Sequence, residues 1–387
     1  MSIDEIENYE TPQYDFVQLT KSHSDLKPFF NVISNKLELT SESINLLTKY
    51  ILADEFNIKI NLLPHHLCPI IPSRVQYLQI IKSVLLECGL IIKDERIKGL
   101  DVGTGPYAIY ALLAHKIFNW EMICTDIDEE SISNCEKIIR SNGLDRFITI
   151  KKSEFYGQEI NEKFQFSLSN PPFYESKEEM DRGYEFKPYK IQVKGTNSEL
   201  IYGNGGEVGF IKKLIDNSID FKDKIIWFSS LIGKKSTVGI IIGYLKHKFL
   251  KNFFIKDYQI GNTKRWIVFW SYQNYRAIVN KSFFKDILIT SINIKLNIIK
   301  IETILKTFTP YLNYHRDDDG DSLYITCYNQ CWTRQFKRRL KFENKIACLE
   351  SEKSIFIVTP DLIRWKFGSS YKTFQSFYAF LQKNYKE

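Results

Sequence analysis

The sequence predicts an α/β protein whose core is a doubly wound, mostly parallel sheet with an antiparallel final part. Strand-like and helix-like segments alternate between residues 97 and 231, which is the order that produces βαβ units. A turn of sequence Asp101-x-Gly-x-Gly follows the first of these strands, and Asn170-Pro-Pro-Phe follows a later one. With 387 residues, the chain is long enough for two or three domains, each with its own core.

Residues 1–90 are expected to form a helical extension in front of the sheet. Apolar residues recur at helical spacing over residues 42–55, directly after Ser41, a residue type that suits a helix N-cap. A second amphipathic helix is expected over residues 77–86, and it should end near Gly89. Three prolines interrupt the chain between the two segments.

Residues 91–280 are expected to form the sheet domain. Its strands are expected at residues 97–102, 121–124, 148–151, 164–168, 225–231 and 266–270, and its helices at residues 107–118, 129–141 and 207–219. The polar, glycine-containing residues 174–206 are expected to form a long loop.

Residues 281–387 are expected to form a small α+β domain. Strand-like patterns cover residues 322–328 and 354–359, and a final helix rich in aromatic residues covers residues 371–381. This part of the chain also holds most of the excess charge. Residues 291–387 contain 16 Lys and Arg against 10 Asp and Glu, so they carry +6 of the net charge of +7. A basic patch favours a polyanionic partner, although a solvated helix face is the plainer alternative.

Composition excludes several classes of protein. The longest apolar runs, such as residues 225–228, are far too short to cross a bilayer, and the acidic N-terminus lacks an apolar signal core. The seven cysteines are scattered and form no Cys-x-x-Cys pair. We therefore expect reduced thiols, with no disulfide framework, no metal site and no association with membranes.

The glycine turn is the first candidate for a binding site. Gly103 and Gly105 would let the backbone approach a ligand closely, and the following helix would present its free N–H groups. Asp126, about twenty residues on at the end of the next strand, could accept hydrogen bonds from both ribose hydroxyls of an adenosine. This pattern does not separate a dinucleotide from S-adenosylmethionine. In the alternative, the glycines only turn a loop and Asp126 caps a helix together with Asp128.

The tetrapeptide that begins at Asn170 is the most informative segment. It follows a strand expected beside the glycine strand, at the carboxyl edge where open α/β sheets bind ligands. The Asn170 amide oxygen and the Pro171 carbonyl could accept two hydrogen bonds from an exocyclic amino group, while Phe173 could stack on a planar ring. Methyl transfer to such a nitrogen depends on alignment with the donor. A proline-stiffened turn with a capping Asn is the alternative.

An ordered set of motifs indicates the family that the chain resembles. The motifs are Pro72-x-Arg-x-x-Tyr, Asp101-Val-Gly-Thr-Gly, Thr125-Asp-Ile-Asp, Asn170-Pro-Pro-Phe, Gly205-Gly-Glu-x-Gly-Phe, Leu231-x-Gly-Lys-Lys and Gly261-x-Thr-x-Arg-Trp. Over residues 10–275 the chain resembles the class I adenine-N6 methyltransferases. Within them it resembles the methyltransferase-like protein 16 family, which includes bacterial 23S rRNA adenine-N6 methyltransferases.

This resemblance implies a Rossmann-like core, S-adenosylmethionine as cofactor, and adenosine N6 in a structured RNA, first of all U6 small nuclear RNA, as the methyl acceptor. Arg74 is implied to meet the methionine carboxylate of the cofactor and Asp126 its ribose. The implied cofactor-binding set is Arg74, Asp101, Gly103, Thr104, Gly105, Asp126 and Asn170. The implied catalytic set is Asn170, Pro171, Pro172 and Phe173, and the implied RNA contacts of the core are Lys234, Lys235 and Arg265.

Eukaryotic members of the family carry an additional RNA-binding domain after the core. The resemblance therefore implies that residues 281–387 are an RNA-binding accessory, with Lys337, Arg338 and Arg339 as contacts, and that residues 1–90 also bind RNA. An autonomous structural cap is the alternative for the C-terminal part. We expect a monomer in the nucleus, or in the cytoplasm if the substrate is another RNA.

Other functions stay open at this stage. The methyl acceptor could be an adenosine of large-subunit ribosomal RNA, a DNA adenine or a glutamine side chain of a protein. The chain could also be a non-catalytic RNA-binding scaffold on the same fold. Pro106 directly after the glycine turn and the divergent loop after Phe173 depart from the family pattern.

Overall fold

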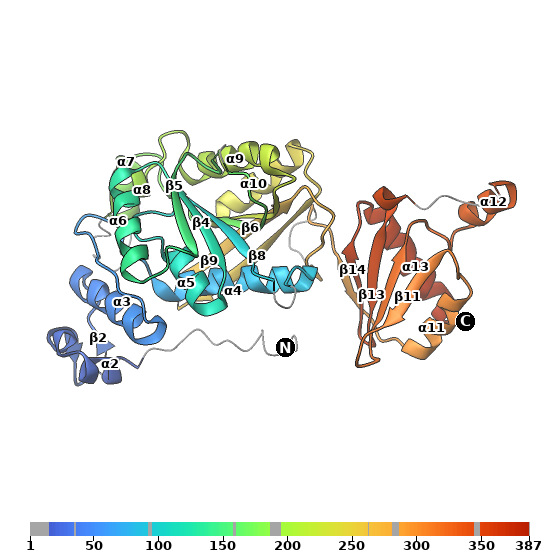
Figure 1. The fold of residues 1–387 in the computed structure, drawn as a ribbon, viewed down its shortest axis with the longest axis horizontal. Coiled ribbons are helices and arrows are strands. Elements are labelled where there is room, and N and C mark those ends of the chain that lie inside the picture. Colours follow the sequence, from blue (N-terminus) through green and yellow to red (C-terminus); the bar gives the residue numbers. More distant parts are fainter. Residues whose placement is uncertain are drawn as a thin grey trace. The chain divides into compact units, whose positions relative to one another are not determined.

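The computed structural model describes residues 15–34, 36–91, 95–157, 160–185, 195–261, 263–280, 286–343 and 349–386 (Figure 1). The chain divides into two compact units. The first comprises Met1–Ser83, Ile91–Leu250 and Ile255–Trp270, and the second comprises Val84–Leu90, Lys251–Phe254 and Ser271–Glu387. Whether the chain functions as the three expected domains stays a prediction.

The first described elements are short or helical. They are α2 (Phe16–Ser22), η1 (Ser24–Phe29), β1 (Phe30–Asn31), β2 (Lys36–Leu37), α3 (Ser41–Phe56) and α4 (Ile71–Cys88). Thr40, rather than the expected Ser41, is the N-cap of α3, because its hydroxyl accepts a hydrogen bond from the Ser43 amide at 3.1 Å. α4 begins six residues before the expected start. Pro72 falls in its first turn, where a helix needs no N–H donor.

The first unit is built on a seven-stranded sheet of order β5-β4-β3-β6-β7-β9-β8. Its strands are β3 (Lys98–Val102), β4 (Glu121–Asp126), β5 (Ile148–Lys152), β6 (Phe164–Ser169), β7 (Ile225–Ile232), β8 (Asn252–Ile260) and β9 (Thr263–Ser271). The strands β3 to β7 pair in parallel, and β9 pairs antiparallel to β7. The predicted fold class is therefore confirmed.

Helices cover both faces of this sheet, with α4 and α5 (Ile109–Phe118) on one side and α9 (Gly206–Ser218) and α10 (Lys235–His247) on the other (Figure 1). The remaining helices are α6 (Glu129–Ser141), α7 (Lys177–Glu185), α8 (Asn197–Leu200) and η2 (Ile219–Phe221). Every predicted strand and helix of this region is present, with ends displaced by a few residues.

Three parts of the prediction for this sheet need correction. The segment 174–206 is not a continuous loop, because it contains α7 and α8. The helix α10 and the strand β8 were not predicted. α7 is too polar to show an apolar face, and two glycines lower the helix propensity of α10. α10 forms because it buries Val238, Ile241 and Leu245, so packing outweighs local preference.

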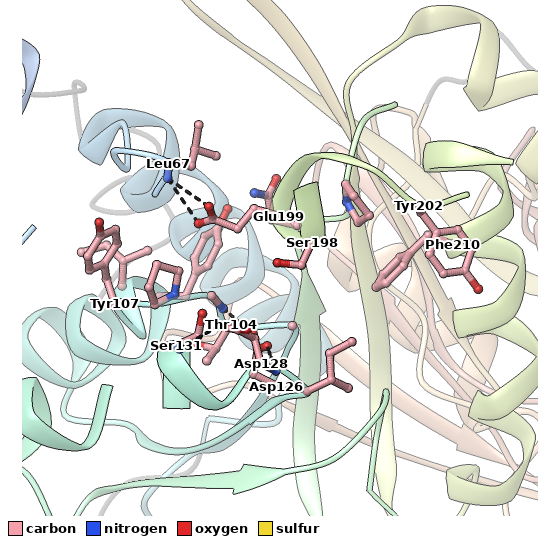
Figure 2. A pocket seen from close by; sticks show the side chains of 18 of the residues that line it. Leu67, Thr104, Tyr107, Asp126, Asp128, Ser131, Ser198, Glu199, Tyr202 and Phe210 are labelled. Atoms are coloured by element: carbon pink, nitrogen blue, oxygen red, sulfur yellow. Dashed lines mark hydrogen bonds between the residues drawn. The ribbon is translucent and has the colours of Figure 1, made fainter. Parts of the chain in front are cut away.

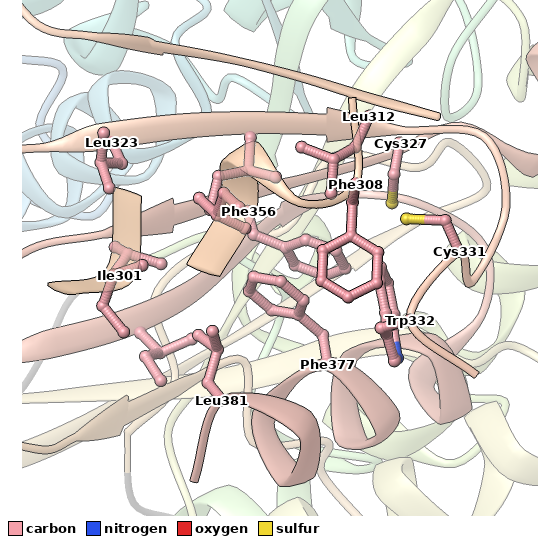
Figure 3. Close-up of a cluster of buried hydrophobic side chains, with 14 of the residues drawn as sticks. Ile301, Phe308, Leu312, Leu323, Cys327, Cys331, Trp332, Phe356, Phe377 and Leu381 are labelled. Carbon is pink, nitrogen blue, oxygen red and sulfur yellow. The ribbon is translucent and has the colours of Figure 1, made fainter. Parts of the chain in front are cut away.

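The second unit contains an antiparallel sheet of order β10-β14-β13-β12-β11. The strands are β10 (Ser291–Asn293), β11 (Leu312–Arg316), β12 (Leu323–Cys327), β13 (Ser354–Val358) and β14 (Leu362–Phe367), and the helices are α11 (Ile298–Lys306), α12 (Arg334–Glu343), η3 (Glu350–Glu352) and α13 (Tyr371–Lys386). Aromatic rings form its core, where Phe356 stacks on Phe377 with centroids 4.3 Å apart (Figure 3).

The exclusions drawn from composition can be compared with the described structure. Among the described residues, no helix is long and apolar enough to cross a membrane, and no group of three or more His, Cys, Asp or Glu is placed to hold a metal ion. The six described cysteines are free thiols, five of them buried. The seventh, Cys348, lies outside the described residues.

Candidate active site

A cavity of about 250 Å³ opens at the carboxyl ends of β3, β4 and β6 (Figure 2). The glycine turn after β3, the end of β4 and the Asn170 tetrapeptide after β6 all contribute to its wall. Parallel strands direct their carboxyl ends to one edge, and the tight pairing of β3 with both β4 and β6 brings these three loops together.

Asp126 holds the glycine turn in shape. Its Oδ2 accepts a hydrogen bond from the Gly105 amide at 2.8 Å, and its Oδ1 accepts one from the Asp128 amide at 3.0 Å. Gly103 and Gly105 have φ of 70° and 66°, which side chains other than glycine rarely adopt. Helix capping belongs to Asp128 alone, whose carboxylate accepts from the Ser131 amide at 2.8 Å. Burial raises the pKa of Asp126.

Asp101 lies behind the turn, outside the lining of the cavity. The Thr104 hydroxyl donates to Asp101 Oδ2 at 2.6 Å, while Asp101 Oδ1 has no hydrogen-bond partner among the described residues. Burial raises the pKa of Asp101 to about 7, with a smaller contribution from the nearby Asp126 charge. The structure therefore places Asp101 as a support of the turn, not as a wall of the cavity.

The cavity brings together six of the seven residues predicted to bind a cofactor. They are Arg74, Gly103, Thr104, Gly105, Asp126 and Asn170. Arg74 comes from the first turn of α4, and its guanidinium lies 5.3 Å from the centre of the Tyr110 ring. Four carboxylates line the wall, and Arg74 is the one lysine or arginine among the described lining residues. Such a wall suits a ligand with a positive charge and several hydroxyl donors.

Asn170, which lines this cavity, carries an unused acceptor. The Ser169 hydroxyl donates to the Val102 carbonyl at 2.8 Å and so joins the end of β6 to the end of β3. Asn170 follows directly, and its buried Oδ1 has no hydrogen-bond partner in the part of the chain that the structure describes. A buried acceptor without a partner is costly, so this oxygen is suited to a donor on a ligand.

The rest of the tetrapeptide is held by two glycine motifs further along the chain. Pro172 lines the cavity, whereas the half-buried Phe173 lies against Gly233 outside it. A Cβ atom at Gly233 would lie 2.8 Å from Phe173 Cε1, and one at Gly206 would lie 2.9 Å from the Glu175 amide nitrogen. Glu207 accepts a hydrogen bond from the Gly233 amide. These motifs therefore shape the wall beside the tetrapeptide.

The predicted RNA-contacting residues occupy different settings. Lys234 Nζ is paired with Glu179 Oε1 of α7 at 2.5 Å, so it is not a free surface cation. Lys235 is exposed at the start of α10, and Arg265 is half-buried in β9. In the second unit, Lys337, Arg338 and Arg339 are all exposed on α12.

Several lining residues were not predicted from the sequence. They are Leu67, Pro69, Ile127, Ser153, Glu154, Phe155, Ser198, Glu199, Tyr202 and Phe210 (Figure 2 labels five of them). Phe155 follows β5, so tracing each parallel strand to its carboxyl end could have found it. Tyr202 follows no such rule, because it lies after α8 in the segment beyond Phe173. Phe210 lies in α9, and the motif that begins at Gly205 was the sequence signal for it.

The sequence is similar to those of known RNA methyltransferases. A protein family described as RNA methyltransferase matches residues 5–274. The U6 small nuclear RNA (adenine-(43)-N(6))-methyltransferase of Schizosaccharomyces pombe is 28% identical and aligned over 88% of this chain and 93% of its own. Ribosomal RNA large subunit methyltransferase F of Flavobacterium johnsoniae is 31% identical over 69% of this chain and 92% of its own.

Solved structures show the same fold. The catalytic domain of hMettl16, in complex with a hairpin of the MAT2A 3′UTR, superposes with a TM-score of 0.62 at 22% identity, over 73% of this chain and 96% of that domain. The N-terminal domain of human METTL16 in complex with SAH superposes with a TM-score of 0.56 over 68% of this chain.

Proposed function

This chain belongs to the methyltransferase-like protein 16 family of RNA methyltransferases, and on that premise we propose that it methylates N6 of an adenosine in a structured RNA. The methyl donor is S-adenosylmethionine. The observation that carries the proposal is the buried, unpartnered Oδ1 of Asn170 in the same cavity as the glycine turn. Such an oxygen can accept a hydrogen bond from the amino group of adenine.

The cavity residues fit the cofactor. Space is open above Gly103 and Gly105, where an added Cβ atom would meet no atom within 4 Å. Arg74 would bind the methionine carboxylate through its guanidinium, and each Asp126 oxygen keeps a lone pair for a ribose hydroxyl. When bound, the cofactor supplies an electrophilic methyl group on a sulfonium.

The residues of this chain contribute alignment more than proton transfer. The nitrogen lone pair of adenine N6 is delocalised into the ring, so the rate depends on holding that nitrogen in line with the methyl group. Asn170 Oδ1 would fix the amino group by accepting one of its hydrogens. Phe173, held against Gly233, would support the extruded base by stacking. No dedicated base is required, because the product loses its proton readily to water.

U6 small nuclear RNA is the preferred substrate. The alignment with the Schizosaccharomyces pombe enzyme covers 88% of this chain, so it must extend into residues 281–387, whereas the alignment with the bacterial enzyme covers 69%. A U6 substrate would place the protein in the nucleus, and we expect it to act as a monomer. An adenosine of large-subunit ribosomal RNA is the second candidate, favoured by the 31% identity with the bacterial relative.

RNA contacts outside the cavity are part of the proposal. The exposed cations Lys337, Arg338 and Arg339 on α12 would bind phosphates, as would Lys235 at the start of α10 and Arg265 in β9. Lys234 would do so only after leaving Glu179. Residues 1–90 would add further RNA-binding surface.

The test incubates the protein with U6 RNA, with large-subunit ribosomal RNA, and with DNA and protein acceptors, followed by mass spectrometry of the modified nucleosides and residues. N6-methyladenosine in U6 RNA is the expected product. Asn170→Ala should lower turnover at least ~10²-fold with RNA affinity nearly unchanged, as for loss of a group that positions the transition state. The control is Asn313→Ala, which alters an exposed Asn of β11. RNA binding without methyl transfer by the wild type would instead indicate a scaffold.

A further inference from the structure

We propose that Glu199 is a positioning residue that closes the roof of the cofactor cavity by joining two distant segments of the chain. The inference rests on the proposed function and concerns the same cavity. One roof segment precedes α4 and includes Leu67 and Pro69, and the other includes Ser198, Glu199, Ile201 and Tyr202. Both lie in the first unit, and Figure 2 shows the Glu199 carboxylate reaching the Leu67 backbone.

The Glu199 carboxylate is the point at which the two segments meet. The Leu67 amide donates to both of its oxygens, at 3.3 Å to Oε1 and 3.2 Å to Oε2. From its own segment, the Thr196 amide donates to Oε2 at 2.8 Å. His66 Nδ1 lies 3.3 Å from the same oxygen. The Glu199 side chain is only 12% exposed, so water competes weakly for these bonds.

The same segment is also bonded to the residue that follows the tetrapeptide. The Tyr174 amide donates to the Leu200 carbonyl at 3.0 Å, and the Tyr202 amide donates to the Tyr174 carbonyl at 2.9 Å. Glu199 therefore stands between two halves of the site. On one side is the segment that leads into α4 and Arg74, and on the other is the segment bonded to the Asn170 tetrapeptide.

Helix capping does not account for this arrangement. Glu199 and Thr196 form a capping box for α8, which explains the bond to the Thr196 amide. It does not explain why the same carboxylate reaches the Leu67 amide, 132 residues away in the sequence. Attraction to His66 does not explain the buried position of the Glu199 carboxylate either. Glu130 Oε2 also approaches His66, at 3.5 Å, but its side chain is 71% exposed.

Three variants separate the contact with Leu67 from the charge beside His66 and from the capping of α8. Glu199→Gln keeps the size of the side chain but replaces one acceptor oxygen with a donor. If the remaining oxygen stays at the Oε2 position, with the Thr196 amide, the new NH₂ group faces the Leu67 amide in place of Oε1. Glu130→Gln removes the same charge beside His66 without touching the roof. Thr196→Ala removes the capping hydroxyl of α8, which also donates to Glu199 Oε2 at 3.1 Å, and keeps the bonds from the Leu67 and Thr196 amides to the carboxylate.

We expect Glu199→Gln to raise the dissociation constant of S-adenosylhomocysteine and the KM for S-adenosylmethionine about tenfold, which corresponds to about 1.4 kcal/mol. RNA affinity should stay within about twofold, and both controls should behave as the wild type. Hydrogen exchange should show faster exchange of the Leu67 amide in Glu199→Gln alone.

Two results would overturn the inference. One is wild-type S-adenosylhomocysteine affinity in Glu199→Gln. The other is an equal loss of cofactor and RNA affinity together with a lower Tm, which would indicate general structural damage. If the wild type neither binds S-adenosylhomocysteine nor methylates RNA, the proposed function fails and this inference fails with it. If the wild type is active and Glu199→Gln binds S-adenosylhomocysteine as the wild type does, the positioning role of Glu199 is refuted and the proposed function stands.

Discussion

Gly233→Ala should impair methyl transfer by moving the ring of Phe173. A Cβ atom at residue 233 would lie 2.8 Å from Phe173 Cε1, 2.9 Å from Cδ1 and 3.0 Å from Glu207 Oε1. Carbon atoms in contact normally lie about 3.5–4.0 Å apart, so the ring must move by roughly 0.7–1.2 Å. Glu207 cannot yield easily, because it is 3% exposed and accepts a hydrogen bond from the Gly233 amide.

The size of the effect follows from this displacement. A misplacement of about 1 Å in a group that orients a substrate costs up to ~10²-fold in rate. We therefore expect kcat to fall by about 10–10²-fold. Gly233 does not line the cofactor cavity, so the dissociation constant of S-adenosylhomocysteine should change less than about twofold. Overpacking should also lower the free energy of unfolding by about 1–3 kcal/mol.

The assay measures single-turnover methylation of U6 RNA, with cofactor affinity measured separately by calorimetry. Gly239→Ala is the control, because an added Cβ there meets no atom within 4 Å and the residue lies in α10, the helix that follows Gly233. That change should stabilise the helix by up to ~1 kcal/mol and leave kcat unaltered. A Gly233→Ala enzyme with the wild-type rate would refute the role of Phe173 in holding the base.

Three further predictions concern Asp126, the cations of α12 and Asp101. Asp126→Ala should weaken S-adenosylhomocysteine binding at least tenfold in calorimetry, or about 1.4 kcal/mol, and an unchanged affinity would contradict its role. Replacing Lys337, Arg338 and Arg339 by Gln should weaken RNA binding and flatten its dependence on salt, whereas an unaltered slope would exclude them as phosphate contacts. For Asp101, burial raises the pKa from 3.8 to about 7. The folded state then keeps a proton that the unfolded state releases, so the free energy of unfolding should fall as pH rises from about 4 to about 7, and level off above. Urea titrations should show a weaker fall in Asp101→Asn, and an identical pH profile would contradict this account.

The order of elements was predictable because strand-like and helix-like segments alternate clearly along the sequence. The strands β3 to β7 and the helices α5, α6 and α9 all bury apolar side chains, and a parallel sheet covered by helices is the arrangement that buries both. The elements that were missed lack this signal. α7 is polar and α10 contains Gly239 and Gly243, whereas β8 carries apolar residues such as Phe253 and Phe254 without a strict alternation. Their structure comes from contacts with distant residues.

The amino-acid sequence by itself determined the fold class, the family and the chemical groups at the carboxyl edge of the sheet, because motif spacing and periodicity are local properties of the chain. Only the tertiary structure decided how those groups are used. It places Asp101 behind the turn instead of in the cavity wall, pairs Lys234 with Glu179, and brings Glu199 to the Leu67 amide. Each of these arrangements depends on burial or on a bond between segments far apart in sequence, and neither is encoded in local spacing.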